Sequence, residues 1–139
     1  QRVSALCLLQ TGFLTLALSL FSTVASASDA EIVSFEAELL PILKARCAVC
    51  HMTGQEPGAM ALTPDKAWSA LVAQRAVGVE NMLRVAPGDP QASYLLHKLW
   101  GSHRSVGGAG SRMPMHQPAL KTAALLQFEQ WVMAGAPNN

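Results

Sequence analysis

Two cysteines and a histidine lie close enough in the sequence to act as one chemical unit, in the stretch Cys47-Ala48-Val49-Cys50-His51. The spacing CxxCH is that of covalent haem attachment, in which both sulfurs bond to the porphyrin edge and the histidine ligates the iron. On a helical turn, residues i and i+3 share a face, so Cys47 and Cys50 can reach two neighbouring porphyrin substituents. The motif therefore predicts one covalently bound haem c, attached through Cys47 and Cys50 and ligated by His51.

Three other uses of these residues compete with haem attachment. A tetrahedral zinc site has four ligands, so it would need one more histidine besides Cys47, Cys50 and His51. A thioredoxin-like redox pair needs a βαβ context, and no strand run of that kind flanks the motif. The third use is a pair of core or disulfide cysteines followed by an unrelated histidine. The three residues at this spacing, in an exported chain, favour haem.

The N-terminal stretch has the pattern of a secretory leader. Residues 3–27 carry no charge and are mostly apolar, with Arg2 in front and Ala25-Ser26-Ala27 at the end, which predicts cleavage between Ala27 and Ser28. The stretch also exceeds the roughly 20 residues that span a bilayer. We therefore expect export to the periplasm, with an uncleaved membrane anchor as the alternative.

After the leader, residues 28–139 are enough for one small domain. Cys7 lies in the leader, so Cys47 and Cys50 are the only cysteines of this domain, and haem attachment would use both. A disulfide framework is thereby excluded. The whole chain, Arg2 included, has a net charge of +1, which gives no electrostatic signature of a nucleic-acid partner. A domain this short gains stability by enclosing a large apolar cofactor.

Four stretches of the domain have the apolar periodicity and end signals of short helices, which predicts a small all-α fold around the haem. In the first, Ser34 is the expected N-cap, and Pro41 either kinks the helix or starts it. In the last, we expect Phe128 or Trp131 to pack against the first helix, at Phe35 or Leu39. The four run from Ser34 to about Arg46, from Thr63-Pro64 to about Val72, from Asp89-Pro90 through Trp100, and over Lys121 to Ala134.

Residues 101–119 form the longest stretch without a helix pattern, and long irregular loops in small domains tend to be functional. Pro114 favours an extended conformation at Met113. Two predicted helices separate Met113 from His51, so its sulfur can approach the iron from the opposite side. Met113 is therefore the expected second axial ligand. Met115 and His116 are weaker alternatives, and Met115 would face the other way in an extended segment.

The loop 52–62 is rich in glycine and proline, and its backbone is expected to supply a carbonyl to the free ring N–H of His51. Met60 follows His51 too closely to reach the opposite side and is interpreted as a core residue. His97 and His103 are further histidines that could give a bis-histidine iron, with His97 interpreted as a packing residue. The polar tips of three aromatic residues could reach the haem propionates, although such side chains more often fill a core; they are Trp68, Tyr94 and Trp100.

Several short motifs occur in an order that resembles single-haem class I cytochrome c domains of the planctomycete type. They are Pro41-Ile42-Leu43, the CxxCH motif at residues 47–51, Pro87-Gly88-Asp89-Pro90 followed by Ser93 to Leu96, Met113-Pro114, and Trp131 to Ala136. The resemblance implies an all-helical fold around one low-spin haem with His51 and Met113 as axial ligands. The chain departs from the pattern at residues 58–62, Gly-Ala-Met-Ala-Leu, where such domains commonly have a Gly-Gly-Leu stretch.

The expected function is the transfer of one electron at a time between redox partner proteins, not catalysis. A methionine thioether and burial of the ring both favour reduced iron. One alternative is a haem subunit that the uncleaved leader anchors in a membrane electron-transfer complex. The other is a haem enzyme or sensor with five-coordinate iron, which would require that Met113 does not bind.

Overall fold

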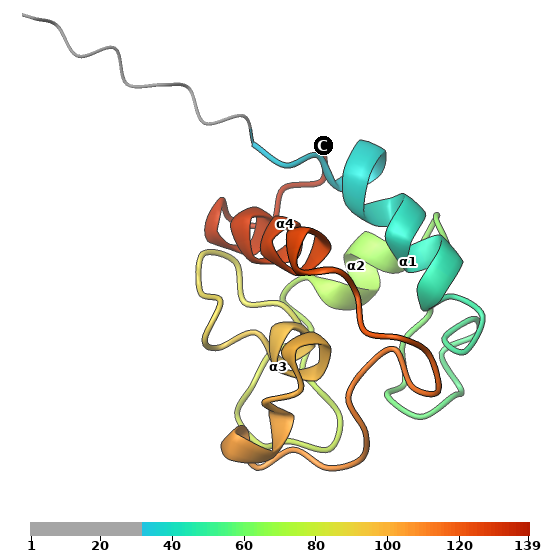
Figure 1. Ribbon diagram of the computed structural model, residues 1–139, viewed down its shortest axis with the longest axis vertical. Coiled ribbons are helices and arrows are strands. Elements are labelled where there is room, and N and C mark those ends of the chain that lie inside the picture. The colour runs from blue at the N-terminus through green and yellow to red at the C-terminus, as the bar shows by residue number, and fades with distance from the viewer. Residues whose placement is uncertain (1–31) are drawn as a thin grey trace, which may run out of the picture.

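The computed structural model describes residues 32–139 (Figure 1). The expected leader, residues 1–27, lies outside this part. Residues 32–139 are helix-rich and contain no β-strand, only isolated bridges, which agrees with the predicted all-α class. Within the same residues, no helix combines the length and the apolar character needed to cross a membrane.

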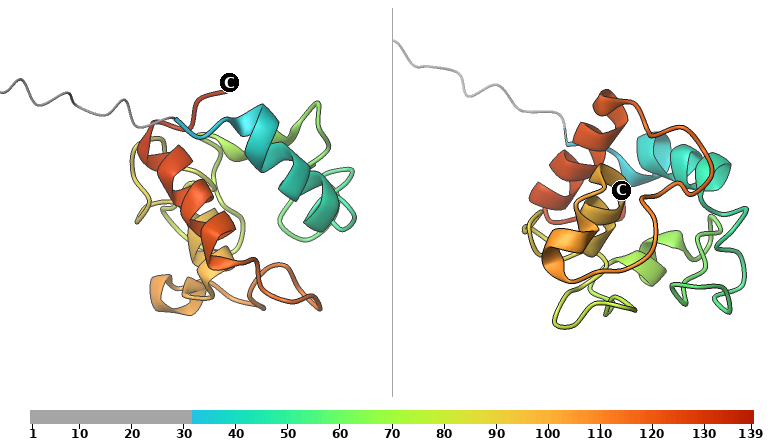
Figure 2. Two further views of the ribbon diagram at one scale, coloured as in Figure 1. Left: turned by 45° about the horizontal axis from the view of Figure 1, so that its top comes forward. Right: turned by 60° about the horizontal axis from the view of Figure 1, so that its bottom comes forward.

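Residues 32–139 form a helical run, three further α-helices and one short 3₁₀ turn. The run comprises a π-helical segment, Phe35–Leu39, and α1, Leu40–Arg46; then follow α2 (Ala67–Leu71), α3 (Tyr94–Trp100), the 3₁₀ turn His103–Val106 and α4 (Thr122–Met133). In both Figures 1 and 2, α1 and α4 are held side by side at one end of the molecule, and irregular segments make up most of the other end. The helix α4 contacts both α3 and the π-helical segment, so it joins the first and third helices.

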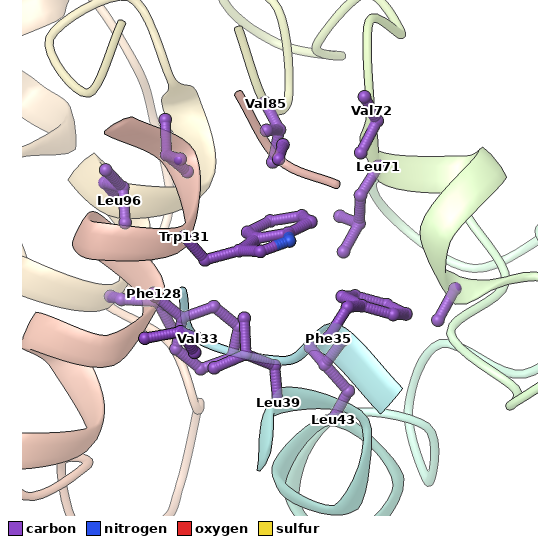
Figure 3. Close-up of a cluster of buried hydrophobic side chains, with 14 of the residues drawn as sticks. Val33, Phe35, Leu39, Leu43, Leu71, Val72, Val85, Leu96, Phe128 and Trp131 are labelled. Carbon is purple, nitrogen blue, oxygen red and sulfur yellow. The ribbon is translucent and has the colours of Figure 1, made fainter. Parts of the chain in front are cut away.

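The core lies where the helical run, α2 and α4 meet (Figure 3). The rings of Phe35 and Trp131 lie with their centroids 5.2 Å apart, which confirms the predicted packing of the last helix on the first. Leu39 and Phe128 are buried beside them. The indole N–H of Trp131 donates to the Pro137 carbonyl at 2.8 Å, so burying this ring leaves no unsatisfied donor.

The start of the first helix is held by reciprocal side-chain bonds, and the predicted N-cap at Ser34 is confirmed. The Ser34 hydroxyl accepts from the backbone N–H of Ala37 at 3.1 Å, and the Glu38 carboxylate accepts from the backbone N–H of Ser34 at 2.8 Å. Asn139 at the C-terminus accepts from Ser34 and Phe35, which ties the two ends of the described chain together. Pro41 lies in the first turn of α1, directly after the π-helical segment, so the regular α-helix starts in the turn that contains the proline.

The predicted starts of two helices are wrong by three or more residues. The expected helix at Thr63-Pro64 begins only at Ala67, and the one expected at Asp89-Pro90 begins only at Tyr94. At both places a separate turn precedes the helix. The Thr63 carbonyl accepts from Lys66 at 2.9 Å, and the Asp89 carboxylate accepts from Ala92 at 3.0 Å.

Candidate functional site

The cysteine motif forms one helical turn directly after α1. The backbone N–H groups of Cys50 and His51 both donate to the Cys47 carbonyl at 3.0 Å, and Cys47 N–H donates to Leu43 at 2.9 Å. Both cysteines are free thiols; Cys47 is half-buried and Cys50 is exposed. Burial raises the pKa of the Cys47 thiol to about 11, so this thiol is neutral at physiological pH.

The loop after His51 folds back over the ring. The Leu62 N–H donates to the His51 carbonyl at 2.7 Å and closes the loop. Gly58 lies beside the ring, since a Cβ built there would be 3.5 Å from Cε1 of His51, an ordinary van der Waals contact. Gly58 also has a φ of +99°, which other residues rarely adopt.

The expected backbone acceptor for the His51 ring is not found. His51 Nδ1 is buried and has no hydrogen-bond partner among the described residues. The carbonyls of Gly58 and Ala59 accept from Arg84 instead, at 3.0 and 2.8 Å, and so are turned to another donor. Burial lowers the pKa of His51, which favours the neutral imidazole that binds metals.

A cleft of two adjoining cavities lies beside His51. The larger cavity has a volume of about 400 Å³ and the smaller one about 120 Å³. A volume of ~300–1,000 Å³ with mostly apolar walls is typical of cofactor sites. Six residues line both cavities, which makes them the shared middle of the cleft: His51, Pro57, Met60, Leu95, Met113 and Met115.

The cysteines lie at one end of this cleft only. Cys47 and Cys50 line the smaller cavity, together with Arg46 and Gln117, and neither lines the larger one. The structure therefore brings Cys47, Cys50, His51 and Met113 to one cleft, although Met113 comes from a different segment. His51 reaches the cleft from the turn after α1, and Met113 from the long loop between α3 and α4.

Met113 is held at the cleft by its backbone. Its N–H donates to the Lys98 carbonyl near the end of α3 at 2.9 Å, and its side chain is half-buried against the core. Met115 also lines both cavities, although 45% of it is exposed, so the expectation that it faces away is wrong. The reason is that the chain bends and turns after Met113 and does not run extended. His116 is exposed and lines neither cavity.

The other histidines are engaged elsewhere. His97 bonds the Ser102 hydroxyl at 2.8 Å and the Gln91 carbonyl at 2.9 Å, in agreement with a packing role. His103 is 3% exposed, and its Nε2 lies 3.0 Å from the Gly110 carbonyl. Neither lines the two cavities, so neither is placed to ligate a metal held there.

Of the three aromatic residues considered for the propionates, only Tyr94 lines the larger cavity. Its hydroxyl packs so closely against Gly108 that a Cβ there would lie 2.3 Å from the oxygen. The Trp68 indole N–H donates to the Ala136 carbonyl at 3.0 Å, and Trp100 lines neither cavity. Trp68 is therefore a packing residue, partly buried against the core, whereas Trp100 is 43% exposed.

Arg46 hydrogen-bonds the long loop, residues 101–119, at the cysteine end of the cleft. Its Nε–H donates to the Gln117 side-chain oxygen and its Nη2 group to the Pro118 carbonyl, both at 2.7 Å. Gln117 donates back to the Arg46 carbonyl at 3.4 Å. Because Arg46 immediately precedes Cys47, these bonds couple the cysteine turn to the segment that carries Met113.

Two cations line the other end of the cleft, and sequence reasoning missed both. Arg84 donates to the carbonyls of Ala70, Gly58 and Ala59, and Lys98 donates to those of Ala109 and Ser111. Burial lowers the pKa of each of the two cations. The only signal in the sequence is that each is a lone charge in an apolar run, Met82-Leu83-Arg84-Val85 and Leu95-Leu96-His97-Lys98-Leu99.

The donor set of the cleft fits a haem better than a bare metal ion. No three side chains of the types His, Cys, Asp and Glu converge in residues 32–139 as a metal site would require, so the zinc alternative has no support there. One histidine and one methionine in a mainly apolar cleft, with two thiols at its end, are the donors that a haem c uses. No family model, curated protein or solved structure matches the chain.

Proposed function

We propose that the chain is an exported single-haem c-type cytochrome that passes one electron at a time between redox partner proteins. One observation carries the proposal: His51 and Met113, from segments far apart in the sequence, line the same cleft, and Cys47 and Cys50 lie at its end. A four-residue set of this kind has few other uses.

Different residues of the cleft would hold different parts of the haem. Cys47 and Cys50 would bond the ring edge, which prevents loss of the cofactor outside the cell. His51 and Met113 would bind the iron, which supplies a one-electron couple when present. Leu95 and Pro57 line the middle of the cleft and contribute to its apolar walls.

The rigid framework suits electron transfer. Met113 is fixed through Lys98, and the cysteine turn through Arg46, so both sides of the cleft are attached to helices. A site whose ligands do not move between oxidation states needs little reorganisation. Cys50 is exposed, so the cysteine end of the cleft is open to a partner protein.

The first experiment tests for the group itself. The full chain is produced in cells that carry out c-type maturation, and haem that stays on the polypeptide in a denaturing gel is measured with the intact mass. The wild type should carry one haem, whereas Cys47→Ala/Cys50→Ala should carry none in covalent form. Absence of covalent haem from the wild type would overturn the proposal. The same mass shows whether residues 1–27 are retained, which separates a free carrier from the anchored subunit.

The second experiment tests the ligand opposite His51. Met113→Ala should lower the reduction potential and open the iron to added ligands, because the thioether that favours reduced iron is lost. Met115→Ala is the matched control, since it removes a methionine from the same cleft and should leave the low-spin spectrum intact. A high-spin ferric spectrum in the wild type would instead favour the enzyme or sensor. Loss of the low-spin spectrum in Met115→Ala alone would move the ligand to Met115.

A further inference from the structure

The two ends of the cleft differ in chemistry: the cysteine end has one cation, Arg46, and the other end has two cations and no cysteine. Arg84 and Lys98 line the larger cavity and not the smaller one, whereas Cys47 and Cys50 line the smaller cavity and not the larger one. The two cations come from different elements, because Lys98 lies on α3 and Arg84 lies in the irregular segment before it. The cleft thus has a thiol end and a cationic end, with His51 and Met113 between them.

Arg84, at the cationic end, has N–H donors that make no hydrogen bond to the described residues. A guanidinium carries five N–H donors, and the structure gives three bonds from Arg84, all to uncharged carbonyls. Its Nε is buried and has no partner among the described residues. A buried, unpaired N–H of a cation costs free energy that an anionic acceptor would recover. The Arg84 side chain can therefore donate further hydrogen bonds to a carboxylate.

Lys98 adds a second cation at the same end. Its ammonium lies near Gly110 and donates to the Ala109 and Ser111 carbonyls, which fixes its position next to the segment that carries Met113. These acceptors are uncharged too, so they leave the charge of Lys98 unneutralised. At the cysteine end, Arg46 already donates to Gln117 and Pro118. Two fixed cations at the opposite end of the cleft indicate a ligand that carries negative charge at one edge.

We propose that Arg84 and Lys98 bind the two propionate carboxylates of the haem. This inference rests on the proposed function. The ring edge that forms thioethers and the edge that carries the propionates lie on opposite sides of a porphyrin. With the first edge at Cys47 and Cys50, the second extends to the cationic end. Arg84 also bonds the Gly58 and Ala59 carbonyls, so the same side chain couples the carboxylates to the loop over His51.

The test compares two ligands that differ only in these carboxylates. The full chain with Cys47→Ala/Cys50→Ala is titrated with haemin and with haemin dimethyl ester, and dissociation constants are read from absorbance. The diacid should bind about tenfold more tightly than the diester, since hydrogen bonds to charged groups are strong. Adding Arg84→Met or Lys98→Met should reduce this ratio, and adding both should bring it close to one.

The ratio separates a lost carboxylate contact from a damaged fold. A variant that merely folds poorly binds both ligands more weakly and keeps the ratio, so the ratio reports the carboxylates alone. Arg75→Met is the matched control, because Arg75 is exposed next to the cavity segment 76–78 but does not line the cavity. It removes the same charge and should leave the ratio unchanged.

A second readout uses the matured protein. In the wild type, Arg84 should keep the neighbouring carboxylate ionised, so the reduction potential should change little with pH while propionates titrate. In Arg84→Met the potential should become more pH-dependent, and in Arg75→Met it should not. Equal affinity for diacid and diester in the parent, or a ratio that survives the double variant, would overturn the inference. Covalent haem in the wild type would leave the proposed function standing in that case.

Discussion

The helical frame and the walls of the cleft are held together in different ways. The frame, which consists of the helical run 35–46, α2 and α4, is joined by buried apolar side chains such as Phe35 and Trp131. The cleft walls, residues 51–62 and 101–119, bury few apolar side chains of their own. They are held by long cations that donate to backbone carbonyls far along the chain, from Arg46, Arg84 and Lys98.

The difference follows from the space that the walls enclose. Side chains that fill a core leave no room for a ligand of haem size. The two walls of the cleft therefore cannot be stabilised by packing their side chains against each other. A long side chain can bridge from the frame to a wall and satisfy the carbonyls there at the same time. The cleft thereby stays open, and the carbonyl groups of its loops still have hydrogen-bond donors.

The largest effect on stability is expected from the frame. Trp131→Ala removes a fully buried ring from the centre of the core and should lower the free energy of unfolding by about 3–5 kcal/mol. Denaturant unfolding of the wild type and the variant in the same haem state measures this. Leu126→Ala is the control on the same helix, because Leu126 is 45% exposed and its loss should cost far less. Equal losses in both variants would contradict the division into frame and walls.

A smaller effect, confined to one wall, is expected at Arg46. Arg46→Met removes two bonds to Gln117 and Pro118 and should cost about 1–3 kcal/mol. Hydrogen exchange should become faster at residues 111–118 and stay unchanged in α4. Lys44→Met, at an exposed position on the same helix, should leave both regions unchanged. If exchange in α4 rose as much as in the loop, the bonds of Arg46 would stabilise the whole frame and not this wall alone.

The cap of the first helix should contribute less again. Ser34→Ala removes the acceptor for the Ala37 N–H and the hydroxyl donor to Asn139, and should cost about 1 kcal/mol. Thermal unfolding compared with Ser111→Ala measures it, since Ser111 is exposed and its hydroxyl makes no bond in the described part of the chain. A cost at Ser111 equal to that at Ser34 would show that the cap is not what stabilises this end.

The frame was predictable from sequence because apolar periodicity reports burial directly. The spacing of Leu39, Leu43, Phe128 and Trp131 indicates one face of each helix, and these faces meet. The cationic end was not predictable, because Arg84 bonds carbonyls 25 and 26 residues away and carbonyls are the same at every residue. The cysteine turn was expected, whereas the unpartnered His51 Nδ1 and the inward position of Met115 depend on how the loops bend.

The smallest effect should come from Glu56, which holds the start of the loop after His51. Its carboxylate accepts hydrogen bonds from the Thr53 N–H and hydroxyl and from the Gly54 N–H. Its own backbone N–H has the largest influence, and together these donors lower the pKa of Glu56 to about 2. A carboxyl with a lower pKa in the folded state stabilises the fold above its unfolded pKa, and this stabilisation is lost as the pH falls through the folded value.

Glu56→Gln should therefore be less stable than the wild type at neutral pH, and the difference should disappear as the pH falls from about 4.5 towards about 2. Denaturation midpoints of both proteins across this range measure it. Glu80→Gln, at another exposed position, is the matched control for the loss of one surface carboxylate. If the deficit of Glu56→Gln stayed constant down to the lowest pH, the ionised carboxylate would not be what holds the loop.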